Sequence, residues 1–386
     1  MINLIYDKSL HGFYENIKGD LKYAALLVFC LGLSVLFRRY VNAAVRIKVD
    51  GLIGLAINAY VSGWMVFYSL ACVVGHLVLY RVIRDPKQLS QISFFGTFTY
   101  LGFLRVIHWF GLPRLEFITN AIQLIMTLRV IGLSYEIADN RAGVAGELKK
   151  IVEPSTFEAF NYLYSYTGIF TGPYYSYRTY SDAFAADFNV RAGHLGDLLR
   201  PKLRTLSWSL PILLLMNYVA PVKILQLEES GDYHVLHLFF LSALAFIYLR
   251  MRIYSAWMVA ESICAISGIG IYPKNQNAEP GGGPKRALEA GEEVLEYDTA
   301  TIDNLDIPQV ENSDGFRWRF IRMRGFEMMA CGFLLLTWTD TFRLWKNTYF
   351  WLHLLSVSIL LLQQAGVFRR RPKSDMPAAE SRSKAE

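Results

Sequence analysis

Charged residues are scarce in this chain of 386 residues, because they make up 19% of it while 53% of the residues are hydrophobic and 15% are aromatic. They gather in patches between long apolar runs, and residues 51–80 contain no Lys, Arg, Asp or Glu. This pattern excludes a soluble globular fold and is typical of a protein that crosses a membrane several times. We expect no cleavable signal peptide, because Asp7, Glu15 and Asp20 lie among the basic residues at the N-terminus.

Cysteine is also scarce, and its spacing excludes a zinc-binding pair. The four cysteines all lie inside apolar runs, at Cys30, Cys72, Cys264 and Cys331. This placement predicts small buried side chains and no metal site. The net charge of +6 comes largely from Lys and Arg at the ends of the runs. Such residues anchor spans by the positive-inside rule, so we expect a lipid bilayer as a partner and no nucleic acid.

The order of the apolar runs predicts an all-α polytopic membrane protein with about nine transmembrane helices, some of them short or broken. Residues 1–273 form the first part of the membrane domain, and 274–325 form a soluble loop. Two last spans follow in 326–367. Residues 368–386 form a disordered tail, whose basic start predicts a cytosolic C-terminus. We find no internal repeat, which argues against a transporter built from two symmetric halves.

The length of the uncharged run 51–80 fits neither one transmembrane helix nor two. As one helix it would be about 45 Å long, which exceeds a hydrocarbon core of about 30 Å but is short for two full spans. Its middle, residues 58–63, reads Asn-Ala-Tyr-Val-Ser-Gly, which is a plausible break. We therefore predict two shorter helices or a tilted, re-entrant pair.

The most informative segment is 164–180, where an aromatic run is interrupted by Gly172-Pro173 and then meets Arg178. Proline removes a helical hydrogen-bond donor and glycine weakens a helix. Two interpretations remain open. Either the segment is a helix end at the membrane interface, with its tyrosines in an aromatic belt, or it is a buried break whose backbone groups are satisfied by protein or by a wet cavity.

The same segment resembles the membrane-bound O-acyltransferase family, and most closely its lysophosphatidylinositol acyltransferase branch. Residues 250–257, Arg-Met-Arg-Ile-Tyr-Ser-Ala-Trp, are similar to a second block of that branch. Leu-Glu-Tyr-Asp at 295–298 is similar to a third, and residues 328–353 to a fourth. The blocks occur in the family's order over most of the chain.

The resemblance implies helices around a tunnel and an endoplasmic reticulum membrane. It implies transfer of an acyl group from acyl-CoA, the co-substrate, to the free hydroxyl of lysophosphatidylinositol. Acyl-CoA and lysophosphatidylinositol are then the binding partners, and no bound cofactor or metal is expected. Nine residues are expected to bind substrate, with phosphate as the natural partner of the arginines: Gly172, Pro173, Tyr177, Arg178, Arg250, Arg252, Tyr254, Trp257 and Glu261. The alternative for the arginines is snorkelling toward the lipid headgroups.

The catalytic portion departs from the family. Acyl transfer needs a base for the hydroxyl proton and donors for the oxyanion. The resemblance implies that the base is a His in a Trp-His-Gly motif, preceded by a Trp-Asn segment. None of the histidines stands in that context: His11, His76, His108, His194, His234, His237 and His353.

The chain is short between 298 and 328, with a junction expected at 316–319. We therefore assign no catalytic residue and expect an inactive chain. The alternative is a non-catalytic lipid-binding or regulatory membrane protein. His353 is a weak substitute for the base, since the resemblance places it on the last span.

Overall fold

The computed structural model describes residues 10–145, 150–170, 172–184, 192–219, 235–278, 283–286 and 297–299, together with the single positions 346, 354 and 358. The chain divides into two compact units, Met1–Val219 with Tyr248–Asn312, and Ala220–Ile247 with Ser313–Glu386. Of the second unit, the structure describes residues 235–247, which begin a helix, and the three single positions, which are helical. Apart from these three positions, the last two predicted spans lie outside the described residues, as do the predicted junction at 316–319 and the predicted tail.

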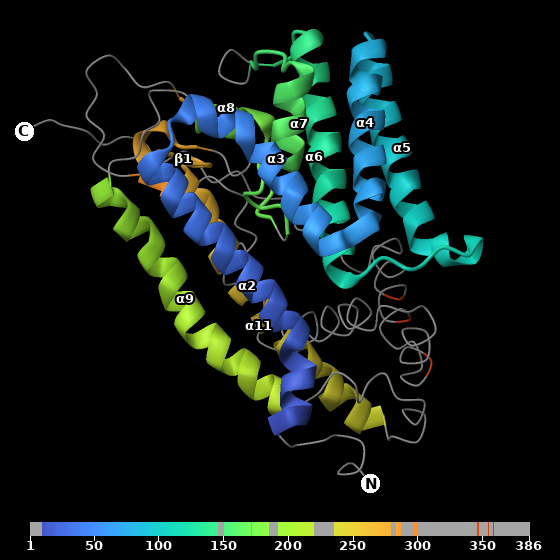
Figure 1. The fold of residues 1–386 in the computed structure, drawn as a ribbon, viewed down its shortest axis with the longest axis vertical. Coiled ribbons are helices and arrows are strands. Elements are labelled where there is room, and N and C mark those ends of the chain that lie inside the picture. Colours follow the sequence, from blue (N-terminus) through green and yellow to red (C-terminus); the bar gives the residue numbers. More distant parts are fainter. Residues whose placement is uncertain are drawn as a thin grey trace, which may run out of the picture. The chain divides into compact units, whose positions relative to one another are not determined.

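The described part is almost entirely helical, which confirms the predicted all-α class (Figure 1). Its α-helices are α2 (Leu10–Tyr40), α3 (Ala43–Ser62), α4 (Val66–Val82), α5 (Pro86–Val106), α6 (Phe117–Arg141), α7 (Thr156–Tyr164), α8 (Tyr177–Asp182), α9 (Ala192–Val219) and α11 (Val235–Ser267). Three 3-10 turns accompany them, η1 (Gly63–Met65), η2 (Ile107–Phe110) and η6 (Lys274–Gln276). Strands β1 (Ile271–Pro273) and β2 (Tyr297–Thr299) pair antiparallel.

Three helical stretches within the described residues are long and apolar enough to cross a membrane, by length and composition: Ile17–Tyr40, Ala43–Val82 and Phe117–Arg141. The second contains the uncharged run, and it is bent as predicted, because η1 separates α3 from α4. The predicted total of about nine spans includes segments outside the described residues.

A chain of buried hydrogen bonds lies at the bend between α3 and α4. The Asn58 amide nitrogen donates to Ser69 Oγ over 2.8 Å, and the Ser62 hydroxyl donates to Asn58 Oδ1 over 2.8 Å. Thr119 of α6 donates to Ser62 over 2.9 Å, and the hydroxyls of Ser69 and Tyr164 are 2.9 Å apart. Because buried polar groups need partners, this chain links α3, α4, α6 and α7 at the bend.

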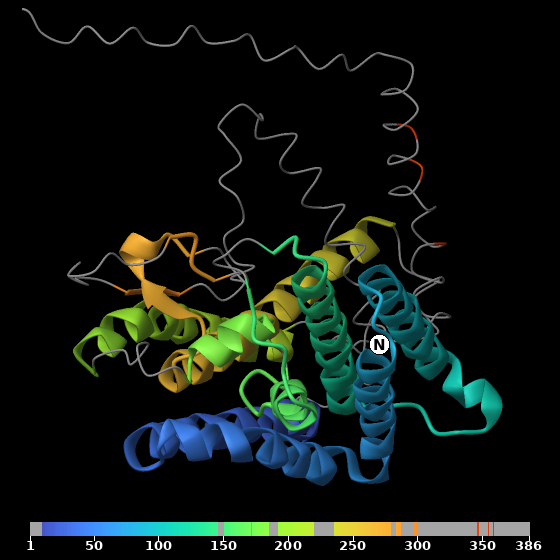
Figure 2. The same cartoon turned by 90° about the horizontal axis from the view of Figure 1, so that it is seen from above.

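Helices α4, α5 and α6 pack against one another and lie side by side when seen from above (Figure 2). Ser134 of α6 joins them through polar contacts, since its hydroxyl donates to Ser93 of α5 over 2.7 Å and lies 3.3 Å from Nδ1 of His76 on α4. His76 is buried. This places His76 as a packed core histidine, in agreement with the sequence-based interpretation.

Helix α3 approaches α7 so closely that glycine is required. A Cβ added at Gly54 would lie 1.7 Å from the carbonyl oxygen of Tyr164, and one at Gly51 would lie 2.5 Å from Cα of Asn161. The Gly51 amide also donates to Oδ1 of Asn161 over 3.0 Å. Small residues allow such backbone contact between membrane helices.

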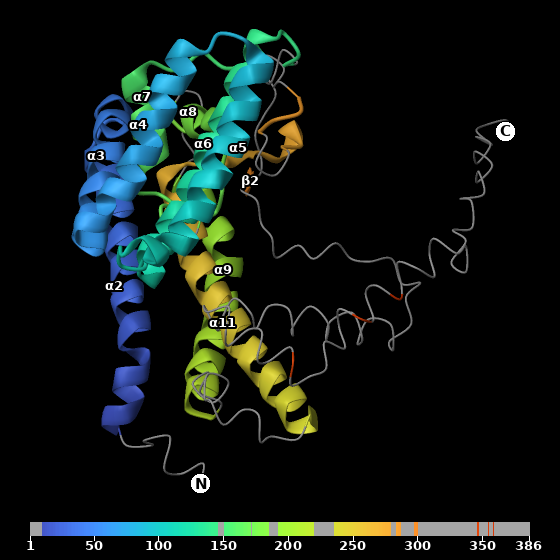
Figure 3. The ribbon, with the colours of Figure 1, turned by 90° about the vertical axis from the view of Figure 1, so that its right-hand side faces the viewer.

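Helices α2, α9 and the part of α11 from Tyr248 onward run alongside one another (Figure 3). Asp20 and Ser34 of α2 bond to Tyr248 and Ser267 of α11, over 3.1 Å each, so α2 and α11 run parallel. Ser209 of α9 meets Ser255 of α11 at 3.0 Å, and Lys202 pairs with Glu261, so α9 runs antiparallel to α11.

Two arginines cap the C-terminal end of α11. Arg38 donates to the carbonyl oxygen of Ile266 over 3.0 Å, and Arg46 donates to that of Ser267. The last carbonyls of a helix have no partner inside the helix and carry a partial negative charge. Arg38, in the last turn of α2, and Arg46, in the first turn of α3, therefore hold the end of α11.

Candidate functional site

The segment between α7 and α8 is a buried, non-helical break. Tyr166, Ile169, Phe170 and Tyr175 are each no more than 2% exposed. Gly172 has φ +88°, a conformation that favours glycine, and the following peptide bond to buried Pro173 is cis. The aromatic-belt interpretation is therefore wrong for these tyrosines, and the interpretation as a break enclosed by protein is confirmed.

Arg129 of α6 holds the start of this break. Its side chain is fully buried, and its Nη1 donates to the carbonyl oxygens of Tyr162, Leu163 and Ser165 over 3.0 to 3.3 Å. Its Nη2 donates to the carbonyl oxygen of Thr167 over 2.6 Å and to the Tyr175 hydroxyl over 2.8 Å. These carbonyls lie in the last turn of α7 and just after it. A cation there supplies the missing donors and complements the helix dipole.

Glu136 holds the other end of the break. Its carboxylate accepts the backbone N–H groups of Tyr177 and Arg178 over 2.8 and 3.0 Å, at the start of α8. The Ser176 hydroxyl accepts the N–H of Thr179 as the helix cap. Seven residues separate Arg129 from Glu136, so α6 presents them on one face about 10 Å apart. A cation therefore meets a helix C-terminus and an anion meets a helix N-terminus.

Helix α3 closes the break from another side. The Tyr180 hydroxyl donates to Oδ2 of Asp50 over 3.0 Å, and the Tyr175 and Tyr180 rings stack with centroids 6.4 Å apart. Asp50 is buried. The sequence-based prediction named neither Arg129 nor Glu136 nor Asp50. The available signal was the presence of single charges inside or beside apolar runs, which at membrane depth are expected to have a partner or a function.

Arg178 lies in the first turn of α8 and is 9% exposed, which contradicts snorkelling. Its Nε lies 3.7 Å from Oδ2 of Asp182, and Asp182 accepts a 2.9 Å hydrogen bond from the Tyr272 hydroxyl. Burial raises the pKa of the Asp182 carboxyl, opposed by the Tyr272 hydrogen bond and by the charge of Arg178. Nη1 of Arg178 is buried and has no hydrogen-bond partner within the described ranges. Tyr177, another predicted site residue, is also buried.

The remaining predicted residues lie along α11 and form a separate group. Arg252 pairs with Asp20 at 2.6 Å and covers the Phe117 ring at 4.4 Å. Arg250 donates through Nε to the Tyr254 hydroxyl over 2.7 Å. Arg252 precedes the end of α11 by about 22 Å of helix, whereas Arg178 is linked through Asp182 to Tyr272, beyond that end. The structure thus does not bring Arg250 and Arg252 to Arg178.

Glu261 and Trp257 complete the group on α11. Glu261 forms a buried ion pair with Lys202 of α9, which assigns it a packing role between two helices. Trp257 is partly buried. Arg252, Tyr254 and Glu261 therefore mainly join α11 to α2 and α9, and the phosphate-binding interpretation of Arg250 and Arg252 stays a prediction.

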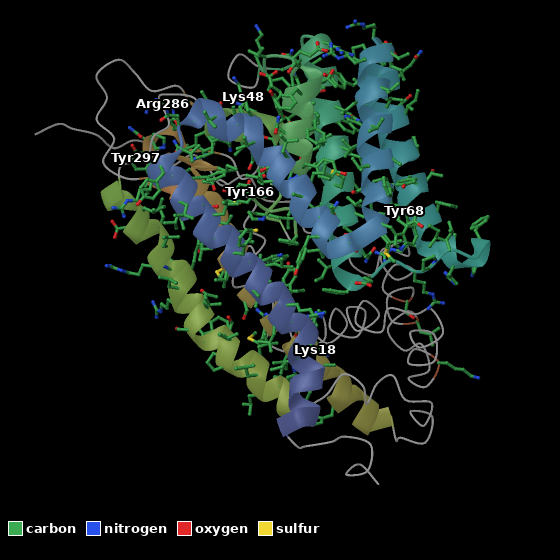
Figure 4. The ribbon with its side chains drawn as sticks, viewed as in Figure 1. Lys18, Lys48, Tyr68, Tyr166, Arg286 and Tyr297 are labelled. Carbon is green, nitrogen blue, oxygen red and sulfur yellow. The ribbon has the colours of Figure 1, made fainter. Side chains whose placement is uncertain are left out.

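The pair of strands β1 and β2 connects the end of α11 to residues of the block at 295–298. Tyr272 of β1 is in register with Asp298 of β2, and Pro273 with Tyr297. Figure 4 shows Tyr297 and Arg286 at the same end of the molecule. Tyr272 also bonds to Asp182, so it links α8 to the strand pair at 297–299, although the sequence predicted only a soluble loop from 274 onward.

Residues 53–322 match the membrane-bound O-acyltransferase family. The chain belongs to this family. It is 30% identical to the membrane-bound acylglycerophosphatidylinositol O-acyltransferase mboa-7 of Caenorhabditis elegans over 435 aligned positions, which cover 88% of this chain and 94% of that relative. The corresponding protein mboat7 of Danio rerio is 31% identical over 298 positions, covering 74% of this chain and 63% of the relative. The human MBOAT7 is 26% identical over 470 positions, covering 92% and 97%.

The longer of these alignments show that this O-acyltransferase family member has fewer residues than its relatives. Because 88% of 386 residues is about 340, about 95 of the 435 positions aligned with the Caenorhabditis elegans protein have no counterpart in this chain. The expectation that the chain lacks family residues is consistent with these lengths.

Proposed function

We propose that this protein belongs to the pathway of phosphatidylinositol remodelling in the endoplasmic reticulum membrane. The reaction of its family branch in that pathway is the transfer of an acyl group from acyl-CoA to lysophosphatidylinositol. Family membership supports the reaction class, because residues 53–322 match an O-acyltransferase family. The relatives named above are acylglycerophosphatidylinositol O-acyltransferases, which supports the acceptor. The observation that carries the proposal is the coverage of 88% of this chain and 94% of the Caenorhabditis elegans relative.

We further propose that this chain binds the substrates without completing the transfer. The acceptor hydroxyl must lose its proton to a base, and the developing oxyanion needs donors. The family's base stands in a Trp-His-Gly motif that this chain does not contain. His76 cannot replace it, since it is buried among α4, α5 and α6 beside Ser134 and away from the break.

The break between α7 and α8 is the proposed substrate-binding region. Gly172 and Pro173 let the chain turn inside the protein, and Tyr177 and Arg178 follow at the start of α8. Arg129 and Glu136 are preorganised at the two ends of the break, so the region keeps its shape without a ligand. Arg178 supplies the cation for a substrate phosphate.

Photoreactive lysophosphatidylinositol tests this binding in microsomes that contain the full chain. We expect labelling that unlabelled lysophosphatidylinositol displaces and lysophosphatidylcholine does not. In the same microsomes, labelled arachidonoyl-CoA should give no phosphatidylinositol product above that of cells lacking the chain. Absence of displaceable labelling would contradict substrate binding, and product formation would contradict the assignment of a chain without a base.

A further inference from the structure

We propose that Arg178, Lys285 and Arg286 together bind a phosphate ester of a substrate. The proposal rests on the proposed function for the identity of that substrate and deepens it by naming the residues that contact the anion. The two sources of a phosphate ester in the reaction are coenzyme A and the lysophosphatidylinositol headgroup. The shared chemistry is a phosphate whose oxygens accept charge-assisted hydrogen bonds.

Arg178 carries a donor that the fold does not use. Its Nη1 is buried without a hydrogen-bond partner among the described residues, although buried charged donors normally have one. Two described carboxylates that interact with Arg178 already have other partners. Asp182 accepts from Tyr272 and lies 3.7 Å from Nε of Arg178, beyond hydrogen-bond distance, while Glu136 accepts two backbone N–H groups. The Arg178 guanidinium can therefore donate a hydrogen bond to one more anionic acceptor.

The segment 283–286, whose first residue lies against Arg178, carries two more cations. The backbone of Gly283 lies against Arg178, since a Cβ added there would be 3.5 Å from Cζ and Nε of Arg178 and 3.3 Å from the Tyr272 hydroxyl. Lys285 and Arg286 follow within two and three residues, and both side chains are exposed. Their backbone N–H groups donate to the carbonyl oxygen of Gln276 over 3.2 and 3.3 Å, which holds the segment in position.

This arrangement suits a phosphate at the edge of the protein. Arg178 offers a rigid fork from a buried position, and Lys285 and Arg286 add positive charge from solvent. The three cations carry more charge than Asp182, the carboxylate that contacts the Arg178 side chain among the residues that the structure describes. Figure 4 shows Arg286 at this end of the described helices.

The test measures how fast an amine-reactive reagent modifies Lys285 in the full chain, read by mass spectrometry. Coenzyme A, lysophosphatidylinositol and inorganic pyrophosphate are the probes. Lys87, an exposed lysine in the first turn of α5, is the control within the same molecule. With a probe at about ten times its Kd, we expect at least one probe to slow modification of Lys285 about tenfold, because only the unoccupied fraction reacts, and to leave Lys87 unchanged.

The pattern of protection identifies the source. Protection by coenzyme A alone assigns the site to the acyl donor, and protection by lysophosphatidylinositol alone assigns it to the acceptor. Protection by pyrophosphate alone supports the anion site while the proposed function fails. Arg178→Gln should abolish protection and Arg178→Lys should retain part of it. Arg286→Glu, at an exposed side chain, should weaken the affinity for the protecting probe about tenfold in a chain whose folding is checked by its melting temperature. Equal modification with and without all three probes, or full protection in a folded Arg178→Gln chain, would overturn the proposal.

Discussion

Removal of the Arg129 guanidinium should destabilise the protein more than any exposed arginine substitution. Arg129→Met keeps the length and apolar stem of the side chain but removes every donor. The carbonyl oxygens of Tyr162, Leu163, Ser165 and Thr167 and the Tyr175 hydroxyl then lose this partner. Their burial prevents water from replacing it without opening the fold.

The magnitude follows from the cost of unsatisfied groups. Each buried acceptor left without a partner costs about 1–3 kcal/mol, and a hydrogen bond from a charged donor contributes about 1.5–3 kcal/mol. The losses are not additive, because the carbonyls share one donor group and the break can relax. We therefore expect about 4 kcal/mol, which is roughly a thousandfold in the folding equilibrium. This is a large share of the 5–15 kcal/mol that stabilises a typical domain.

The assay is the apparent melting temperature in detergent, together with abundance in microsomes. Arg105→Met is the matched control, since Arg105 is an exposed residue in the last turn of α5. Arg129→Lys should lie between the two, because lysine keeps the charge but cannot span five acceptors. If the melting temperature of Arg129→Met is within a degree of that of Arg105→Met, the break does not depend on the hydrogen bonds of Arg129.

Three further predictions concern the supports of the break and of α11. Gly54→Val should abolish folding, because its Cβ would lie 1.7 Å from the Tyr164 carbonyl oxygen; abundance in microsomes measures this, and near-normal abundance would contradict the close packing. Glu136→Ala should cost about 2 kcal/mol in thermal unfolding, since two N–H groups at the start of α8 lose their acceptor, and an unchanged melting temperature would refute that role. Lys202→Met should cost about 3 kcal/mol, and adding Glu261→Met should recover most of it, because the single variant removes the ion-pair partner of the buried Glu261 carboxylate; additive losses in the double variant would argue against the pair.

The sequence predicted the breaks but not what holds them. The bend at 58–63 follows from helix length and local composition, and the Gly172-Pro173 break follows from backbone chemistry. Arg129 and Glu136, which bond to the two ends of the break, are distant from it in sequence. They become recognisable only when α6 is placed beside it, because their role depends on a pairing between helix ends.

The structure places the predicted site residues in two separate groups, a division that the sequence did not predict. Arg178 is buried beside Asp182, which is bonded to Tyr272. Arg252 looked equivalent in sequence, yet it pairs with Asp20 near the start of α2. Strands of three residues, such as β1, give too short an alternation to be predicted, so the pairing of Tyr272 with Asp298 was missed.

We propose that this chain retains the substrate-binding part of a lysophosphatidylinositol acyltransferase and lacks its catalytic segment. The most direct test inserts between Asp314 and Met328 the segment that the family resemblance leads us to expect there, with its Trp-Asn and Trp-His-Gly motifs. Transfer of labelled arachidonoyl-CoA to lysophosphatidylinositol is then measured in microsomes from cells lacking the endogenous enzyme. We predict no transfer by the original chain and transfer by the restored one. Transfer by the original chain, lost in His353→Ala, would contradict the claim and make His353 the base.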